Sequence, residues 1–360
     1  MDYGYLLRPE DLTLIGRNMN AGNLAAWNID SSAFPASGSA IDKARFAVRY
    51  AILAPSSHNT QPWRFIINGD ELLVCTDRTR SLPNIDPFDR ELIISCGAAL
   101  FNLRVAFAHF SVPVEITTFP QSSDPDIVAR IVFPDSGPKL NDLAELFEAI
   151  TKRVTNRGPF VDEDMPNPII ELFKSAAMLE GVDVKFARTP KERDPIAALV
   201  AEADRRQFDD PRFRRELASW IHPSRRNDGM PAASQGLGTL TDAATPIIAM
   251  AIRTFDLGNG VAAAHKQLAY GSPLLVVPST SMDNNEGWLA AGLGLQRMLL
   301  VAVKEGYYTS YLNQPIEVPD LRVCLANGLS IAGYPQLVLR VGRGFPVSHS
   351  PRRPMSDVLI

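Results

Sequence analysis

The chain has 360 residues, of which 46% are hydrophobic and 21% are charged, so it can form two domains with sizeable cores and is neither disordered nor fibrous. Its net charge of -4 gives no overall basic field, which argues against nucleic acid as a partner and leaves local Arg clusters as the only sites for anions. The N-terminal segment carries charges through any candidate signal region, and no run reaches the roughly eighteen apolar residues of a membrane span. We therefore expect a cytoplasmic protein with no membrane partner.

The first half of the chain, which we place at 39–137, follows an N-terminal arm at 1–38. A helix is expected to begin at Ser39, because Ser39 and Asp42 form a capping-box-like start. Two β-rich runs, "RFIIN" and "ELLVCTD", flank a Gly-Asp turn and predict a hairpin. The segment "ELIISCGAALFNLRVAFAHF" is apolar on nearly every face, which is typical of a buried central helix, and the strand-like runs "VPVEITTF" and "DIVARIVF" follow it.

The same order begins again in a second half, which we place at 138–360. "LNDLAELFEAITKR" predicts a helix, "GVDVKFAR" a strand, "WLAAGLGLQRMLLVAVKEGYY" a second apolar helix and "PQLVLRVG" a closing strand. Aligning the two apolar helices places Gly97 on Gly292 and makes most apolar positions coincide. We interpret this order as a degenerate internal duplication, with a chance likeness of two buried helices as the alternative. A segment at about 190–270, rich in charge, Gly and Pro, has no counterpart in the first half and predicts a lid or an interaction arm.

The stretch "LAPSSHNTQPWRF" concentrates hydrogen-bonding groups in the loop after the first helix. Ser56, Ser57, Asn59 and Gln61 offer two hydroxyls and two amides beside the backbone N–H groups, a set that suits a flat polar heterocycle or a phosphate. A polar turn bonded only to itself is the alternative. His58, in the same loop, is either a proton donor or a structural side chain.

A second polar cluster lies in "TKRVTNRGPF", where Arg153, Thr155 and Arg157 alternate and would project to one side of an extended chain. Two guanidinium groups and a hydroxyl suit a phosphate, whereas an exposed helix end rich in Arg is the alternative. In "SPRRPMSDVLI", Arg352 and Arg353 stand between prolines, where a solvated tail is the simplest interpretation. No metal-ligand spacing, serine-hydrolase elbow or dinucleotide fingerprint occurs. We therefore expect no metal and assign no catalytic side chain, because a cofactor would bring its own reactivity.

Together these motifs resemble the nitroreductase family of FMN-dependent oxidoreductases. The first is similar to the family's Pro-Ser-Ser-x-Asn-x-Gln-Pro-Trp signature, the second to its Arg-x-Ser/Thr-x-Lys/Arg element, and "SPRRP" to its basic C-terminal element. The loop "SYLNQPIE" lies where family members pass near flavin N5. The resemblance implies an α+β nitroreductase-like fold and FMN contacts from these residues: Pro55, Ser56, Ser57, Asn59, Gln61, Arg153, Thr155, Asn156, Arg157, Asn313, Gln314, Arg352 and Arg353.

The distribution of the motifs departs from the family's usual homodimer, in which each FMN site takes the Arg element from one chain and the Pro-Ser-Ser element from the other. Here the first half has only the Pro-Ser-Ser motif, and "AAMLEGVDVKF" stands where a second copy is expected. The resemblance therefore implies a fused pseudo-dimer, monomeric or paired as a homodimer, with one FMN site across its internal interface. In this it is similar to the double-domain subgroup that includes the mycobacterial Acg-type proteins, in which a lid over the flavin suggests sequestration.

Three functions stay open at this point. An enzyme of this kind would take hydride from NADPH or NADH through FMN and reduce a nitroaromatic, a quinone or a similar small-molecule acceptor. A storage protein would hold FMN beneath a closed insertion without turnover. An oxidase of a peptide or natural product would use the same flavin with oxygen as acceptor. We expect the oxidoreductase, with storage as the principal alternative.

Overall fold

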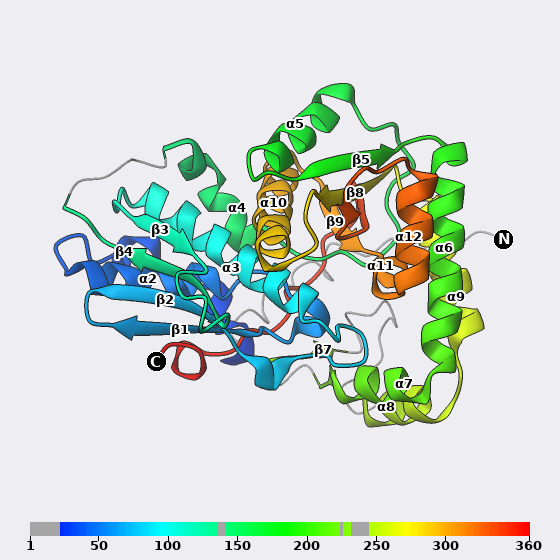
Figure 1. The fold of residues 1–360 in the computed structure, drawn as a ribbon, viewed down its shortest axis with the longest axis horizontal. Helices are drawn as coiled ribbons and strands as arrows, with labels where there is room; N and C mark the ends of the chain where they lie inside the picture. Colours follow the sequence, from blue (N-terminus) through cyan, green and yellow to red (C-terminus); the bar gives the residue numbers. More distant parts are fainter. Residues whose placement is uncertain (1–21, 136–140, 224–225, 232–244) are drawn as a thin grey trace, which may run out of the picture.

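Two antiparallel sheets stand on either side of a pair of crossing helices at the centre of the molecule (Figure 1). The computed structural model describes residues 22–135, 141–223, 226–231 and 245–360. The crossing helices are α3 (Arg90–His109) and α10 (Asn285–Lys304), the two apolar segments that the sequence marked as buried central helices. Helix α3 is long and apolar enough to span a membrane by length and composition, but 89% of its apolar window is buried inside the protein.

The first half contains the predicted helix, hairpin and sheet. Helix α2 (Ala40–Ala51) begins with the predicted capping box, in which the Asp42 N–H donates to Ser39 Oγ at 3.1 Å and the Ser39 N–H donates to Asp42 Oδ2 at 3.0 Å. The sheet has the order β1-β2-β4-β3, and every neighbouring pair is antiparallel. Its strands are β1 (Trp63–Asn68), β2 (Glu71–Thr76), β3 (Glu115–Thr118) and β4 (Ile127–Val132).

The second half repeats this topology with additions. Its sheet has the antiparallel order β5-β8-β11-β9, and β10 pairs with the end of β8. The helix expected at the start of the second half consists of two parts, a 3-10 segment at Asn141–Leu146 followed by the α-helix α4. The elements of this half, apart from α10 and the helices of the insertion, are α4 (Phe147–Lys152), α5 (Asn167–Met178), β5 (Asp183–Ala187), β8 (Leu274–Thr280), β9 (Tyr308–Tyr311), α11 (Gln314–Glu317), α12 (Pro319–Gly328), β10 (Tyr334–Pro335) and β11 (Leu339–Gly342).

The two halves match element by element, which confirms the predicted α+β fold built from two related repeats. The first half runs α2, β1, β2, α3, β3, β4, and the second runs α5, β5, β8, α10, β9, β11. Helix α2 packs on α3 as α5 packs on α10. The long insertion lies between β5 and β8, at the place where the first half has only the Gly-Asp turn between β1 and β2.

The aligned glycines lie at the point where the central helices cross. A Cβ on Gly97 would stand 2.5 Å from the Leu289 carbonyl oxygen, and one on Gly292 would stand 2.9 Å from the Gly97 Cα. Glycine therefore allows the two backbones to approach at a distance that any side chain would prevent. Farther along the crossing, the Gln296 Nε2 group donates to Asn102 Oδ1 at 2.7 Å, and both side chains are fully buried. These contacts fix the position of one half against the other.

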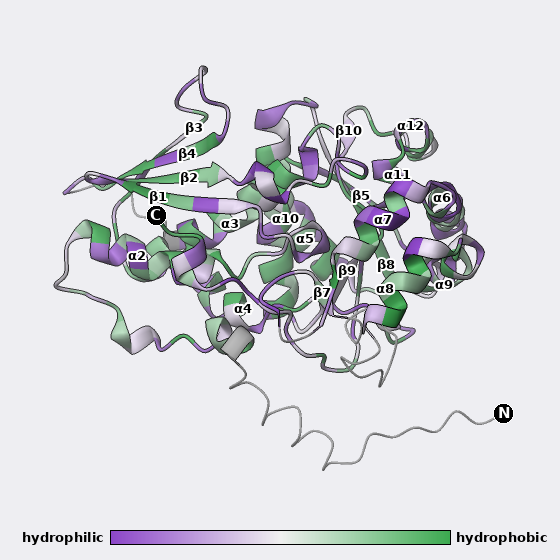
Figure 2. Ribbon diagram, turned by 90° about the horizontal axis from the view of Figure 1, so that it is seen from below, coloured by the Kyte–Doolittle hydropathy of each residue, from purple (hydrophilic) through white to green (hydrophobic). Residues whose placement is uncertain are grey.

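The predicted insertion consists of two parts with different surroundings. Its outer helices, α6 (Pro190–Asp209) and α9 (Gly258–Tyr270), pack against each other, and α6 joins a hydrophobic cluster with strand β8. Its middle, which comprises α7 (Pro211–Ser219), β6 (Ile221–His222), β7 (Met230–Pro231) and α8 (Thr245–Thr254), reaches toward the first half (Figure 1). Helix α7 is mostly hydrophilic and α8 mostly hydrophobic (Figure 2). Among the described residues of the insertion, this middle part lies nearer to the first half than α9 does (Figure 1).

Both ends of the described chain pack on the first half. The C-terminal tail lies beside β1, where the Phe65 N–H donates to the Val358 carbonyl at 2.7 Å and the Ile360 N–H donates to the Phe65 carbonyl at 2.8 Å. The Trp27 indole N–H donates to the Ser350 carbonyl at 2.8 Å, which ties the arm to this tail. Residues 1–21 of the predicted arm lie outside the described residues. The tail therefore belongs to the second half by sequence and to the first half by position.

Candidate active site

A cavity of about 560 Å³ lies between the two halves and extends beneath the insertion. This volume is within the range of small-molecule and cofactor sites. Its walls come from the loop after α2, the start of α3, the segment after α4, strand β9 with α11, and the insertion. The structure places these sequence-predicted residues on the wall: Pro55, Ser56, Ser57, Asn59, Arg153, Thr155, Arg157, Asn313, Gln314 and Arg352.

The loop after α2 adopts a backbone conformation that few sequences tolerate. His58, Asn59 and Gln61 all have positive φ, at 49°, 55° and 53°. Non-glycine residues in this region store strain and persist only where their surroundings hold them. The Gln61 N–H donates to Ser56 Oγ at 2.9 Å, and the Ser57 hydroxyl donates to the Glu91 carboxylate at the start of α3. The loop is thus folded back on itself with its two serines at the cavity.

The amides of Asn59 and Gln61 connect three segments of the chain. Asn59 Nδ2 donates to the Gly229 carbonyl of the insertion at 3.0 Å and to a carbonyl of the C-terminal tail at 3.1 Å. Gln61 Nε2 donates to the Asn227 carbonyl at 2.8 Å, and its Oε1 accepts from the Arg353 N–H at 2.8 Å. Gln61 is fully buried and does not line the cavity; it connects the loop to the insertion and to the C-terminal tail, and its flavin contact stays a prediction.

Alternation along the chain explains why two further predicted residues are absent from the wall. Arg153, Thr155 and Arg157 face the cavity, whereas Asn156 turns away and donates to the Phe345 carbonyl at 2.8 Å. In the tail, Arg352 faces the cavity, whereas its neighbour Arg353 turns away and donates to the Gln61 carbonyl at 3.1 Å. In an extended segment adjacent residues point to opposite sides, which accounts for the pairs Thr155–Asn156 and Arg352–Arg353, although Val154 also lines the cavity.

One end of the cavity is strongly cationic. Arg153, Arg157, Arg340 and Arg352 line it together with Tyr311. No carboxylate among the described residues forms an ion pair with Arg153, Arg340 or Arg352, whose hydrogen bonds go to carbonyl and amide oxygens such as those of Leu53, Gly158 and Asn59. Burial lowers the pKa of all four guanidinium groups, to about 10 for Arg340. Arg153, Arg340 and Arg352 therefore have no carboxylate among the described residues to compensate their charge.

Several buried polar atoms at this end have no partner among the described residues. They are Nε and Nη1 of Arg153, the same two atoms of Arg340, Nε of Arg352, and the Tyr311 hydroxyl. Burial raises the pKa of Tyr311 to about 12, so its hydroxyl stays a hydrogen-bond donor near pH 7. Unpaired buried donors are costly, and a bound phosphate would accept from several of them at once. These residues fit a phosphate group.

His58 lies in the same cavity but is poorly suited to supply a proton. Burial, assisted by the charge of Arg157, lowers the pKa of His58 to about 4, so the ring is neutral near pH 7. Its Nδ1 atom is buried without a partner. The structure thus favours a hydrogen-bonding or packing role over the proton donor that the sequence left open.

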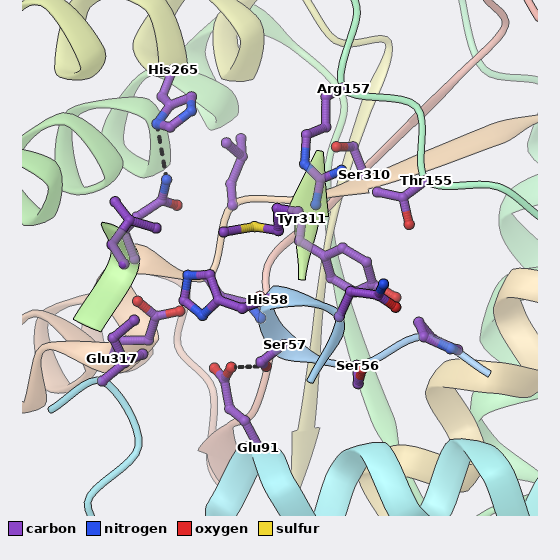
Figure 3. Close-up of a pocket in the computed structure, with 18 of the residues that line it drawn as sticks. Ser56, Ser57, His58, Glu91, Thr155, Arg157, His265, Ser310, Tyr311 and Glu317 are labelled. Atoms are coloured by element: carbon purple, nitrogen blue, oxygen red, sulfur yellow. Dashed lines mark hydrogen bonds between the residues drawn. The ribbon is translucent and has the colours of Figure 1, made fainter. Parts of the chain in front are cut away.

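The other end of the cavity has a different character, and the sequence analysis missed it. Its apolar wall comes from these residues of the insertion: Phe208, Phe213, Leu217, Ile221, Met230, Ile248, Ile252, Leu257 and Val261. Polar side chains lie among them, and Gln207 Nε2 donates to Glu317 at 2.6 Å. Arg157 and Tyr311 lie on one side of the cavity and His265 and Glu317 on the other (Figure 3). Glu317 follows the predicted Gln314 closely in "NQPIE", which was the available signal.

The comparison with known proteins decides the family. The chain is 30% identical over 321 residues to a Mycobacterium tuberculosis (strain ATCC 25618 / H37Rv) protein named "Putative NAD(P)H nitroreductase Rv3131". The matched region covers 88% of this chain and 90% of that protein. This chain belongs to the nitroreductase family. It is also 27% identical to the "Putative NAD(P)H nitroreductase acg" of the same strain, over 88% of this chain and 95% of that protein. No family model matches the sequence.

Two further comparisons accompany this nitroreductase assignment. The chain is 24% identical to the "Probable NAD(P)H nitroreductase PigM" of Serratia sp. (strain ATCC 39006), over 87% of this chain and 92% of that protein. Among solved structures, the FMN-dependent nitroreductase NfnB from Mycobacterium smegmatis in complex with NADPH matches with a TM-score of 0.40 and 14% identity, over 60% of this chain and 97% of that chain. Within the described residues, no group of three or more His, Cys, Asp or Glu side chains could hold a metal ion.

Proposed function

We propose that this chain is an FMN-binding oxidoreductase that takes hydride from NADPH or NADH and reduces a nitroaromatic, a quinone or a similar acceptor. A single FMN would occupy the cavity between the two halves. The observation that carries the proposal is the group of unpaired guanidinium N–H donors on Arg153, Arg340 and Arg352 at one end of that cavity. These donors favour an anion beside a space large enough for a ring system, and membership of the nitroreductase family supports FMN as that ligand.

In this proposal the chain binds and orients the cofactor, which supplies the hydride chemistry when it is bound. Arg153, Arg340 and Arg352, with Arg157, would hold the phosphate by charge-assisted hydrogen bonds. Ser56 and Ser57 would contact the ribityl chain. Thr155, Asn313 and Gln314 would stand near the ring, with the buried Oε1 of Gln314 free to accept a hydrogen bond. The apolar residues of the insertion would keep water from the ring face.

FMN storage is the second candidate, and the way the insertion is fastened favours it. Asn59 and Gly229 exchange two hydrogen bonds, one from each residue, over the loop that would meet the flavin. Next to them, the Asp228 carboxylate pairs with Arg80 and with His222 Nδ1 at 3.0 Å. Although burial opposes it, these hydrogen bonds lower the pKa of Asp228 below its usual range, so the carboxylate stays charged near pH 7.

The visible spectrum of FMN-loaded protein distinguishes the two functions. Under anaerobic conditions, addition of NADPH or NADH is expected to bleach the bound flavin within seconds, followed by reoxidation on addition of a quinone. If the flavin stays oxidised with both nucleotides but bleaches with dithionite, the result would refute the oxidoreductase and support FMN storage. Failure to retain FMN would contradict both.

The Asp228→Asn substitution is expected to loosen the insertion and accelerate FMN release. It removes the charge that Arg80 and His222 share, and the loss of a charge-assisted contact costs roughly 1.5–3 kcal/mol, which corresponds to about a 10- to 150-fold faster dissociation. Stopped-flow fluorescence of flavin release measures the rate. Asp194→Asn, an exposed carboxylate on α6, serves as the control, and equal release rates in the two variants would show that Asp228 does not fasten the insertion.

A further inference from the structure

The two ends of the cavity differ in charge. Four arginines line one end, whereas Glu91, Asp204 and Glu317 line the other within an apolar wall. The Asp204 carboxylate is paired with His265 Nδ1 at 2.9 Å, and Glu91 is paired with Arg90 at 2.8 Å. If the phosphate of FMN occupies the cationic end, the acidic and apolar end remains for the second substrate. An anionic group there would lose its hydration and meet carboxylates, so uncharged compounds are favoured.

Glu317 is the acidic side chain of this end that has no cationic partner among the described residues. Its carboxylate accepts a hydrogen bond from Gln207 Nε2 at 2.6 Å, and its side chain lines the cavity. Glu317 ends the four-residue helix α11, which also carries Gln314, so it is held by an element that packs on α6. The carboxyl is therefore both fixed in place and open to a ligand.

The surroundings of Glu317 favour its protonated form. Burial, together with the charge of Glu91, raises the pKa of Glu317 well above its usual range; the hydrogen bond from Gln207 and the charge of Arg90 act in the opposite direction, while Asp86 raises it further. Asp204 of α6 and His265 of α9 complete the titratable groups at this end of the cavity. A neutral carboxyl in such a site can donate a hydrogen bond and then a proton.

We propose that the insertion-walled end of the cavity is the acceptor site, that it takes uncharged apolar quinones or nitroaromatics, and that the Glu317 carboxyl protonates the oxygen of the acceptor. This inference rests on the proposed oxidoreductase function. Reduction of a quinone requires two electrons and two protons. Bound FMN would supply a hydride to the quinone, and one quinone oxygen would take the Glu317 proton, which would give the hydroquinone and leave Glu317 as a carboxylate. The carboxylate regains its proton from solvent before the next turnover.

The protonation state of Glu317 is tested without any turnover. The infrared spectrum of the FMN-loaded protein at pH 7 is expected to contain the carbonyl stretch of a protonated buried carboxyl, and Glu317→Gln should remove it. The exposed Glu202 of α6, which pairs with Arg205 and Arg206, provides the matched control Glu202→Gln, which should leave the band in place. A spectrum unchanged by Glu317→Gln would overturn the proposal.

The proton transfer is tested by reoxidation of dithionite-reduced protein with naphthoquinone in a stopped-flow instrument. Glu317→Gln is expected to slow reoxidation by about 10²- to 10⁴-fold, the usual contribution of a general acid, and Glu317→Asp should restore part of the rate. In the wild type the rate should fall as pH rises through the pKa of Glu317, because the acid is then lost, and in Glu317→Gln this dependence should disappear. A variant that reoxidises as fast as wild type would refute the role of Glu317.

The acceptor class is tested with naphthoquinone and its sulfonate, which differ by one negative charge. Reoxidation by the sulfonate is expected to be at least tenfold slower in the wild type, and equal rates would contradict an uncharged-ligand site. These outcomes are distinct from failure of the proposed function, because dithionite replaces the nicotinamide donor. Flavin that NADPH and NADH cannot reduce would refute the proposed function and leave the infrared and reoxidation results to decide the acceptor site.

Discussion

Replacing Arg157 with Ala is expected to weaken FMN binding by about 10- to 150-fold, the equivalent of roughly 1.5–3 kcal/mol for a charge-assisted hydrogen bond. Arg157 lines the cationic end of the cavity with Arg153, Arg340 and Arg352, and its charge depresses the pKa of the neighbouring Arg340. Fluorescence titration of the apoprotein with FMN gives the dissociation constant. Riboflavin, which lacks the phosphate, is expected to bind the two proteins with similar affinity if Arg157 acts on the phosphate.

The control for this variant is Arg206→Ala. Arg206 is exposed on the outer helix α6, where it pairs with Glu202 and Asp320 and does not line the cavity. Its loss should leave the dissociation constant of FMN unchanged. An Arg157→Ala protein that binds FMN within about twofold of wild type would refute a phosphate site at this end of the cavity.

The Gly292→Ala substitution is expected to destabilise the fold by about 3 kcal/mol, at the upper end of the cost of overpacking a core. The new Cβ would meet the Ile94 carbonyl and the Gly97 Cα, which are backbone atoms that cannot rotate away. Helices α3 and α10 would have to separate, and the relation between the two halves would change with them. Urea unfolding measures the loss as a lower midpoint at an unchanged slope.

Gly260→Ala is the matched control, because Gly260 lies in helix α9 with no atom near the position of a new Cβ. Alanine there should stabilise the protein by about 0.5–1 kcal/mol through helix propensity. If Gly292→Ala were tolerated as well as Gly260→Ala, the close crossing of the central helices would not be needed for the fold.

The repeated parts of the fold could be predicted because local pattern determines them. The capping box at Ser39, the hairpin at "RFIIN" and "ELLVCTD", and the two apolar helices all form as expected, and the alignment of Gly97 with Gly292 marked the point where the helices cross. The insertion was harder to interpret from sequence. Its ends, α6 and α9, pack as core helices, which a composition rich in charge, Gly and Pro did not indicate.

Residues of the candidate site could be predicted only where they belong to a sequence motif of the family. Residues such as Tyr311, Arg340 and Glu317 come from strands and a short helix that meet at the cavity through tertiary packing, and no local pattern brings them together. The sequence did contain an indication of Arg340, because a charged residue stands within the apolar run that forms the buried strand β11. The resemblance also implied FMN contacts from Asn156 and Arg353. Their side chains turn away from the cavity wall, and these contacts stay predictions.

The fusion of the two repeats changes what a mutation can do. In a pair of identical chains every substitution occurs twice, so a residue that improves one position must also be acceptable at the equivalent position across the two-fold axis. Here β1-β2-β4-β3 and β5-β8-β11-β9 are encoded separately, and each can vary alone. The second repeat could therefore gain the helices between β5 and β8 while the first kept its short turn. Residues of this insertion line the cavity between the halves, and the first repeat did not have to accept the same insertion.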